Sequence, residues 1–347
     1  PSATYWLGSS YTNPTVADAS GVATFSIDRL GYLYAGPGEP YNWTLHSHSQ
    51  LMPIATGMVF FSDHCAPLPP RRSNFHDYDI SGDGFADLLS IDKKGVLRYY
   101  PNNSHSNPGH VPFMTSVVIG SGWTPMLNVS AGDVNGDGHT DIVAATPGGI
   151  LKLYVDDYVH HHTSPFGTSV TIGSGWTAKG IPKFTLADFN GDGYADIIAY
   201  HPDGSAWFYQ NRFPTNRAHP FSTAVRIGTS AGSLPVDLAA GDLNGDGPAD
   251  LVVGPSPQAH PNLAPAGNPE PFGFVVYPFN SAGAENPAGG FALGDWEGRG
   301  YDSLISMSPD GSGNLVYIKD PMPPNSGTFY DPVVISKGWQ GIARIIP

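Results

Sequence analysis

The chain has 347 residues, with 43 glycines, 34 prolines and a formal net charge of −14 at pH 7. An acidic surface repels phosphate backbones, so we expect no nucleic-acid partner. No apolar run approaches the roughly 18 residues of a membrane-spanning helix, so we expect no membrane span. Cys65 is the only cysteine, which excludes a disulfide within the chain.

Short apolar runs between glycine and proline turns predict an all-β chain. Residues 4–36 look like a worn copy of a unit that recurs later, with the stump of an aspartate-rich loop at Asp18. Residues 37–75 break the repeat and are predicted to be an insertion, which in repeat folds usually forms loops. This region and its border hold a group of residues that we interpret either as a metal or acid–base cluster or as ordinary surface, namely His46, His48, His64, Cys65 and His76.

From residue 76 onward a nine-residue aspartate-rich loop recurs. Intact copies begin at Asp79, Asp133, Asp188 and Asp242, each followed at once by an aliphatic strand. Oxygen-bearing side chains at positions 1, 3 and 5, with glycine at position 6, match the first half of an EF-hand calcium loop. Here a fourth side chain closes the loop at position 9. We therefore predict about four Ca²⁺ ions, each held between two strands.

The predicted ligands are the side chains at positions 1, 3, 5 and 9 and the backbone carbonyl at position 7. They are Asp79, Ser81, Asp83, Phe85 and Asp87; Asp133, Asn135, Asp137, His139 and Asp141; Asp188, Asn190, Asp192, Tyr194 and Asp196; and Asp242, Asn244, Asp246, Pro248 and Asp250. A fifth, worn copy begins at Asp295, where Arg299 replaces the third ligand and Ser303 the last.

The loops start 53 to 55 residues apart, and a fixed period of this size indicates a repeat architecture. Four predicted strands in each period fit the blade of a β-propeller. We predict a single propeller domain over residues 1–347, with regular repeats over 76–347 and six or seven blades. The surplus strand at 342–346 is expected to close the ring on the first unit.

The loop and its following strand resemble the FG-GAP (VCBS) repeat of integrin-α-like propellers and of secreted microbial proteins, including a mushroom lectin. The resemblance covers residues 76–347 well and 1–75 poorly. It implies a propeller, generally of seven blades, with calcium in the loops. In the lectin of this family, sugars bind in pockets between blades.

Three tryptophans follow a glycine at one blade position, namely Trp123, Trp176 and Trp339. They fit either platforms for carbohydrate or packing wedges between blades. We find no motif of a hydrolase, metalloprotease or nucleotide-binding enzyme, and we assign no catalytic residue. The run at residues 160–162, three histidines, is interpreted as solvated surface or as a metal site.

The sequence thus favours a secreted, calcium-stabilised lectin that binds glycans or glycoconjugates. Weak calcium sites suit an extracellular medium, and Asn42, Asn102 and Asn128 stand in glycosylation triplets. The alternative is a polysaccharide lyase or glycoside hydrolase with its site in residues 37–76. There His46 or His48 would be the base, and Arg71 or Arg72 would neutralise an acidic sugar.

Overall fold

In a computed structural model of the chain, the structure describes residues 4–7, 15–16, 33–35, 58–59, 78–104, 113–177, 180, 183–229, 237–254, 258–260, 262, 277–278, 290–308, 310–318 and 333–346. By its internal contacts the chain forms two compact units, residues 1–71 and 72–347, where we predicted one domain. The loop stump at Asp18 and the His46–His76 cluster lie outside the described residues, as do Arg71 and Arg72.

The first unit holds one antiparallel sheet among its described residues, in the order β2-β1-β3-β4. Its strands are β1 (Thr4–Leu7), β2 (Thr15–Val16), β3 (Leu33–Ala35) and β4 (Met58–Val59).

The second unit is built from five four-stranded antiparallel sheets, which we number as blades 1 to 5. Blade 1 comprises β24 (Ile342–Ile345), β5 (Leu88–Asp92), β6 (Leu97–Tyr100) and β7 (Val117–Gly120). Blade 2 comprises β8 (Asn128–Gly132), β9 (Asp141–Ala145), β10 (Ile150–Tyr154) and β11 (Val170–Ser174). Blade 3 comprises β12 (Lys183–Ala187), β13 (Asp196–Tyr200), β14 (Ser205–Tyr209) and β15 (Val225–Thr229).

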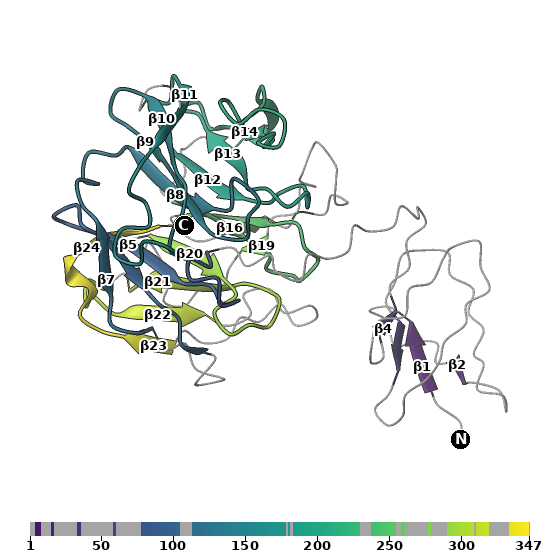
Figure 1. The fold of residues 1–347 in the computed structure, drawn as a ribbon. Coiled ribbons are helices and arrows are strands. Elements are labelled where there is room, and N and C mark those ends of the chain that lie inside the picture. The colour runs from purple at the N-terminus through teal and green to yellow at the C-terminus, as the bar shows by residue number, and fades with distance from the viewer. Residues whose placement is uncertain are drawn as a thin grey trace. The chain divides into compact units, whose positions relative to one another are not determined.

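Blade 4 comprises β16 (Leu238–Gly241), β17 (Asp250–Val253), β18 (Gln258–His260) and β19 (Tyr277–Pro278). Blade 5 comprises β20 (Phe291–Gly294), β21 (Ser303–Met307), β22 (Leu315–Ile318) and β23 (Val333–Ser336). Figure 1 shows the innermost strands β8, β12, β16 and β20 gathered around the C-terminus. Strand β8 lies beside β12, β12 beside β16, and β16 beside β20, as expected for a propeller.

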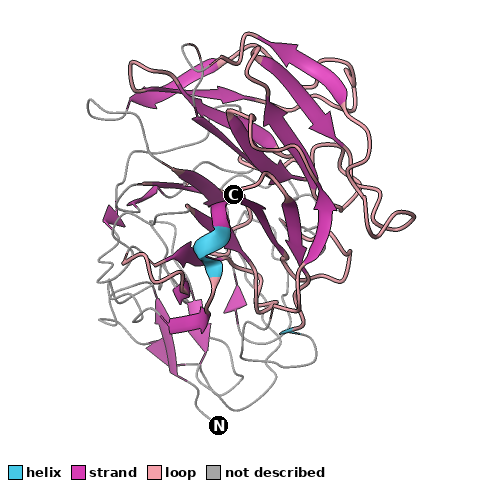
Figure 2. Ribbon diagram, turned by 90° about the vertical axis from the view of Figure 1, so that its left-hand side faces the viewer, coloured by secondary structure: helices cyan, strands magenta, loops and turns pink. Residues whose placement is uncertain are grey.

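The chain ends inside blade 1, and this corrects the predicted blade count. Strand β24 pairs with β5, with Arg344 opposite Ile91 and Ile345 opposite Ser90. A short 3₁₀ turn, Trp339–Gly341, leads into β24 and is the cyan element beside the C-terminus in Figure 2. We predicted six or seven blades because we assigned the last strand, residues 342–346, as the innermost strand of a blade formed by residues 4–36. Instead it completes the first regular repeat, so the ring closes with five blades.

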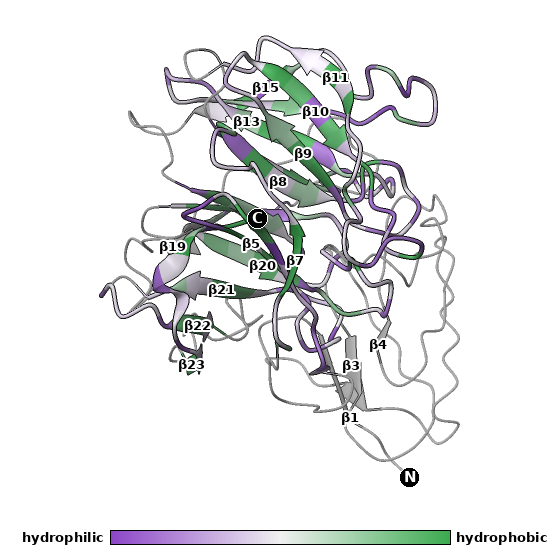
Figure 3. Cartoon of the chain, turned by 60° about the vertical axis from the view of Figure 1, so that its left-hand side comes forward, coloured by the Kyte–Doolittle hydropathy of each residue, from purple (hydrophilic) through white to green (hydrophobic). Residues whose placement is uncertain are grey.

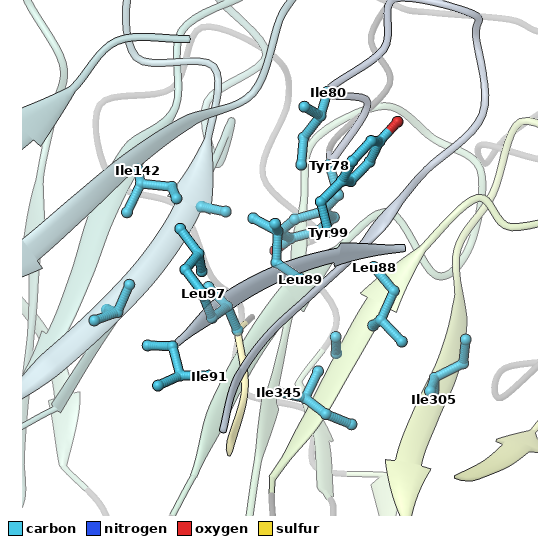
Figure 4. Packing of buried hydrophobic residues seen from close by; sticks show 14 of the residues in the cluster. Tyr78, Ile80, Leu88, Leu89, Ile91, Leu97, Tyr99, Ile142, Ile305 and Ile345 are labelled. Atoms are coloured by element: carbon cyan, nitrogen blue, oxygen red, sulfur yellow. The ribbon is translucent and has the colours of Figure 1, made fainter. Parts of the chain in front are cut away.

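The blades are apolar on both faces because each lies between two neighbours. Strands β9, β13 and β21 are buried along their whole length. Figure 3 shows the inner strands of the blades coloured as hydrophobic, with hydrophilic residues concentrated in loops. Figure 4 shows Ile345 from the last strand in the same region as Leu88 of blade 1 and Ile305 of blade 5. These three side chains belong to one buried cluster, which joins the end of the chain to its first regular blade.

A tyrosine links two blades that are not neighbours in the ring. Tyr78 immediately precedes the first aspartate loop, has a left-handed backbone with φ 72°, and is buried. Its hydroxyl donates to the Ala240 carbonyl of β16, 3.0 Å away. Because blades 1 and 4 are separated on both sides by other blades, this bond crosses the middle of the ring. Among the described residues, no helix has the length and apolarity needed to cross a membrane.

Candidate functional site

The first aspartate of each loop organises the turn through backbone amides. In the third loop, Asp188 Oδ1 accepts from the amides of Gly191 at 2.7 Å and Asp192 at 3.1 Å, and Oδ2 accepts from Gly193 at 2.9 Å. The same three bonds recur in the other intact loops, around Asp79, Asp133 and Asp242. This pattern holds the first carboxylate at a fixed place at the base of the loop.

Glycine at positions 4 and 6 is required by the backbone. Gly136 has φ 76° and Gly138 has φ 90°, a region in which side chains other than glycine are strained. Gly136 is also close to the next loop, since a Cβ added there would lie 2.3 Å from Cε1 of Tyr194. The aromatic residue at position 7 of one loop therefore packs on the position-4 glycine of the preceding loop.

The ninth aspartate is buried and anchored to the strand behind it. Asp196 is fully buried, and its Oδ1 accepts from the amide of Asn211 at 2.6 Å. The Asn211 side chain in turn donates to the carbonyls of Ala195 in its own loop and Val134 in the preceding loop, each at 2.9 Å. The other carboxylate oxygen, Asp196 Oδ2, has no hydrogen-bond partner among the described residues.

Burial and mutual repulsion make these carboxylates hard to ionise. Burial raises the pKa of Asp188 to about 7 and that of Asp133 to about 6, and a neighbouring aspartate adds to each shift. Burial also raises the pKa of Asp196 well above its usual value, and the nearby Asp188 and Asp192 carboxylates raise it further. In the first loop, burial and the nearby Asp79 and Asp83 raise the pKa of Asp87 to about 7.

The loops therefore have the donor chemistry of a hard-cation site. Carboxylate and amide oxygens are the ligands that Ca²⁺ prefers. A divalent cation would neutralise the repelling carboxylates and could take the unpaired oxygen of Asp196. Among the described residues, no three His, Cys, Asp or Glu side chains already form a closed metal-binding group. Amide and backbone carbonyl oxygens would thus have to complete each ligand set, as the loop pattern predicts.

Five backbone hydrogen bonds connect the loops into a closed circle. In each case the amide at position 8 donates to the carbonyl of the first aspartate in the preceding loop. The pairs are Ala86 to Asp295, Thr140 to Asp79, Ala195 to Asp133, Ala249 to Asp188, and Asp302 to Asp242, at 2.6 to 3.3 Å. The peptide that carries the position-7 carbonyl also carries the position-8 amide. A ligand bound by that carbonyl would therefore act on the bond to the preceding loop.

The three Gly-Trp turns lie at junctions between blades. Trp123 of blade 1 packs on Tyr154 of blade 2, with ring centroids 4.8 Å apart, and Trp176 packs on Tyr209 at 5.2 Å. Trp339 stacks on Tyr100 at 4.5 Å. The three tryptophans are only 5 to 6% exposed, and their backbone amides donate to Gly95, Gly149 and Gly313 in that order. The indole faces are thus packed between blades rather than open to solvent.

Polar residues surround each buried tryptophan at the surface. Beside Trp123, Ser121 and Thr124 are exposed, and no atom lies within 4 Å of a Cβ added at Gly122. The corresponding turns have the sequences Ser174-Gly175-Trp176-Thr177 and Lys337-Gly338-Trp339-Gln340, again with open space beside the glycine. Each of these three junctions therefore presents an open turn rimmed by hydrogen-bonding groups.

Two of the three glycosylation triplets have their asparagine inside the fold. Asn102 Nδ2 donates to the carbonyls of Ala86 and Trp296, and Asn128 Nδ2 donates to Phe184. These amides are occupied in the folded protein, while Asn42 lies outside the described residues. In the run at 160–162, the imidazoles of His160 and His161 both contact one exposed carboxylate, that of Asp157.

Sequence reasoning missed the asparagine that follows the third strand of several blades. Asn102, Asn211 and Asn262 each donate to their own loop and to the preceding one. The signal was present in the repeat, because Asn102 and Asn211 both stand 15 residues after the ninth aspartate of their loop. Blade 2 carries Asp156 at the same place.

The fold and loops define an all-β propeller with an aspartate-rich turn before the second strand of each blade. Residues 79–144 and 188–253 match the FG-GAP-like repeat, and the chain thus carries repeats of this type. No curated protein matches the chain.

Three solved structures have a similar arrangement at low identity. The Photorhabdus luminescens Tc holotoxin pore is 20% identical, with a TM-score of 0.36, over 95% of this chain and 14% of that one. An Agrocybe aegerita lectin that recognises non-reducing terminal N-acetylglucosamine is 16% identical, with a TM-score of 0.37, over 76% of this chain and 80% of the lectin. The TcdB2-TccC3-Cdc42 complex is 16% identical, with a TM-score of 0.37, over 88% of this chain and 17% of that one.

Proposed function

We propose that the chain is an extracellular carbohydrate-binding propeller whose ring of loops is stabilised by Ca²⁺. The ion would be held in the four intact loops by the predicted ligands at positions 1, 3, 5, 7 and 9, and sugars would bind at the junctions between blades. A repeated, shallow site suits this role, because several weak contacts to one glycan surface gain avidity together.

Three features of the loops support calcium. Each intact loop places three carboxylates near one another in a partly buried turn, and burial together with their mutual repulsion raises the pKa of the ninth aspartate. In the third loop the buried Asp196 Oδ2 has no hydrogen-bond partner among the described residues, whereas the equivalent oxygen of the other three loops accepts from the amide at position 2. Side-chain amide oxygens at position 3 supplement the carboxylates in three of the loops. Cation binding would relieve the repulsion and supply the missing partner, so calcium should favour the folded state.

The observation that supports carbohydrate binding is the recurrence of one surface turn at three junctions between blades. Ser121, Ser174 and Lys337 precede the Gly-Trp pair, and each is exposed. The buried tryptophan and its tyrosine partner give the turn a rigid floor. Exposed hydroxyl, amide and ammonium groups on such a floor can hydrogen-bond the hydroxyls of a sugar, which is how polar groups orient ligands in shallow sites.

A glycan array with the full chain, run with calcium and with chelator, tests this proposal. We expect binding to a defined group of glycans that weakens when Ser121 and Thr124 are both changed to Ala. The matched control changes Ser222 to Ala, since this hydroxyl lies in the loop between β14 and β15, away from the three turns. Failure to bind any glycan in calcium, by a chain that is folded, would overturn the carbohydrate role.

A further inference from the structure

The fifth loop keeps two of the three backbone hydrogen bonds that define the turn in the other four. Asp295 Oδ1 accepts from the amide of Arg299 at 2.7 Å, and Oδ2 accepts from the amide of Gly300 at 2.6 Å. These are the position-5 and position-6 bonds of the intact loops. The loop also takes its place in the circle, since Asp302 donates to Asp242 and Ala86 donates to Asp295. Its backbone is therefore that of a cation-binding loop, although its side chains differ.

A guanidinium group lies among the side chains that would be ligands. Arg299 Nε is 2.5 Å from Glu297 Oε2, at position 3, and Nη2 is 3.2 Å from Ser303 Oγ, at position 9. Nη2 also donates to the Tyr317 hydroxyl at 3.0 Å. The guanidinium thus contacts the side chains of two ligand positions from within the loop. Glu297 is 7% exposed at its side chain, so this cation is paired with a carboxylate that is almost buried.

Comparison with the first loop shows what the guanidinium replaces. There the Tyr99 hydroxyl donates to the ninth aspartate, Asp87, at 3.2 Å. Tyr317 occupies the same register on its blade, because Tyr99 pairs with Leu89 and Tyr317 pairs with Ile305, each two residues after position 9. In blade 5 the carboxylate at position 9 is lost, and the tyrosine bonds Arg299 and Ser303 instead.

At positions 1, 3, 5 and 9 the charges of the two kinds of loop agree, and the fifth loop carries one further carboxylate, Asp302, at position 8. An intact loop has three carboxylates among positions 1, 3, 5 and 9, and a bound divalent cation would leave it with one net negative charge. In the fifth loop the same positions hold Asp295, Glu297, Arg299 and Ser303, which also carry one net negative charge. Two carboxylates and a tethered monovalent cation are therefore equivalent in charge to three carboxylates and Ca²⁺.

We propose that the Arg299 guanidinium is a covalently attached cation that takes the place of a metal ion in the fifth loop. The ring then has four exchangeable ion positions and one permanent one. The fifth loop stays closed without calcium and holds the junction where the last blade meets the first. The expected number of bound ions rests on the proposed calcium binding. The role of Arg299 in closing its own loop is independent of that proposal.

Counting bound calcium tests the proposal. At a free Ca²⁺ concentration that saturates the loops, the full chain should bind four equivalents by equilibrium dialysis. Changing Arg299→Asp and Ser303→Asp together restores a carboxylate at positions 5 and 9, and this double variant should carry five. The matched control, Asp83→Arg, places an arginine at position 5 of the first loop, and it should carry three. Five equivalents in the unchanged chain, or four in the double variant, would overturn the proposal.

A melting experiment keeps the test independent of the calcium count. Arg299→Met removes the cation but keeps most of the apolar stem, so it should lower the melting temperature by a similar amount in calcium and in chelator. An unchanged melting temperature would overturn the inference. If the unchanged chain binds no calcium, the proposed calcium role fails, and the effect of Arg299→Met alone then decides whether the guanidinium holds the loop closed.

Discussion

The amide of Ala86 donates to the carbonyl of Asp295, 3.3 Å away, and joins the first aspartate loop to the last. With the four equivalent bonds between the other loops, it makes a closed circle of five turns at one end of the propeller. Strand β24 closes the same junction through the sheet, since it adds the C-terminal residues to blade 1. Two kinds of contact therefore close the ring at the junction of blades 5 and 1, namely the hydrogen bond between loops and the pairing of β24 with β5.

The loop carboxylates predict an unusual dependence of stability on pH. In chelator, Asp87 and Asp188 have a pKa of about 7 when folded and about 4 when unfolded. The folded state then binds more protons than the unfolded state, so the free energy of unfolding falls as pH rises from about 4 to about 7. Bound calcium favours the ionised carboxylates and opposes this loss. Urea unfolding at pH 5 and pH 7.5, with and without chelator, checks the prediction. Equal stability at both pH values in chelator would contradict it.

Replacing Asp156 by Asn should stabilise the protein. In blades 1, 3 and 4 the asparagine at this place donates to two backbone carbonyls. Asp156 Oδ2 is instead buried without a hydrogen-bond partner among the described residues, and His139 Nδ1, 3.8 Å away, is too distant to donate to it. Burial raises the pKa of Asp156 to about 7, so its ionised form is disfavoured. Restoring one or two hydrogen bonds should add about 1–2 kcal/mol to the free energy of unfolding.

The reciprocal change is the matched control for this prediction. Asn211→Asp places a carboxylate where an amide now donates to Val134 and Ala195, and it should lower the free energy of unfolding by about 1–3 kcal/mol. The gain from Asp156→Asn should be larger at pH 8 than at pH 5, because the aspartate is ionised at the higher pH. A loss of stability on Asp156→Asn at both pH values would show that the two blades do not share this arrangement.

The contact between successive loops can be measured with two glycines of the second loop. Gly138→Ala should cost about 1–2 kcal/mol, because its left-handed backbone strains an L-residue and nothing lies within 4 Å of the new Cβ. Gly136→Ala meets the same strain and also places its Cβ against Tyr194, which should cost about 1–3 kcal/mol more. Chemical denaturation of both variants gives the difference. Equal losses would mean that Tyr194 moves away without cost.

The junction tryptophans should behave as packing residues in a stability measurement. Trp176 is 5% exposed and contacts Phe184 and Tyr209, so Trp176→Ala should lower the free energy of unfolding by about 3–5 kcal/mol. Trp176→Phe keeps a ring in the junction and should cost less. A loss of glycan binding in Trp176→Ala would therefore not separate ligand contact from folding, and exposed Ser174 is the better probe. A Trp176→Ala variant as stable as the unchanged chain would contradict the packing role.

Much of the second unit could be predicted from the sequence because its repeat is local. The loop residues, the strand after each loop and the glycine positions all follow from one nine-residue pattern. Trp123 and Trp176 could be placed at a common blade position for the same reason. Their burial could not be predicted, because a Gly-Trp turn has the same sequence whether the indole ring faces solvent or packs on the tyrosine of the next blade.

The number of blades depended on a pairing that no local pattern encodes. Residues 342–346 form a strand of the right length for any blade that lacks an innermost strand. The sequence offers two such blades, one at residues 4–36 and one at 88–120. The choice is made by packing, because Ile345 shares one buried core with Leu88 and Ile305. The bond from Tyr78 across the ring likewise depends on the closed arrangement of blades 1 and 4.

The most direct test of the account is the melting temperature of the full chain as a function of free calcium. If the four intact loops bind the ion only when folded, the melting temperature should rise steadily with calcium concentration and fall in chelator. Magnesium should have a much smaller effect, because it requires a tighter octahedral site. A melting temperature that is the same in chelator and in millimolar calcium would contradict the central claim that these loops stabilise the ring by holding cations.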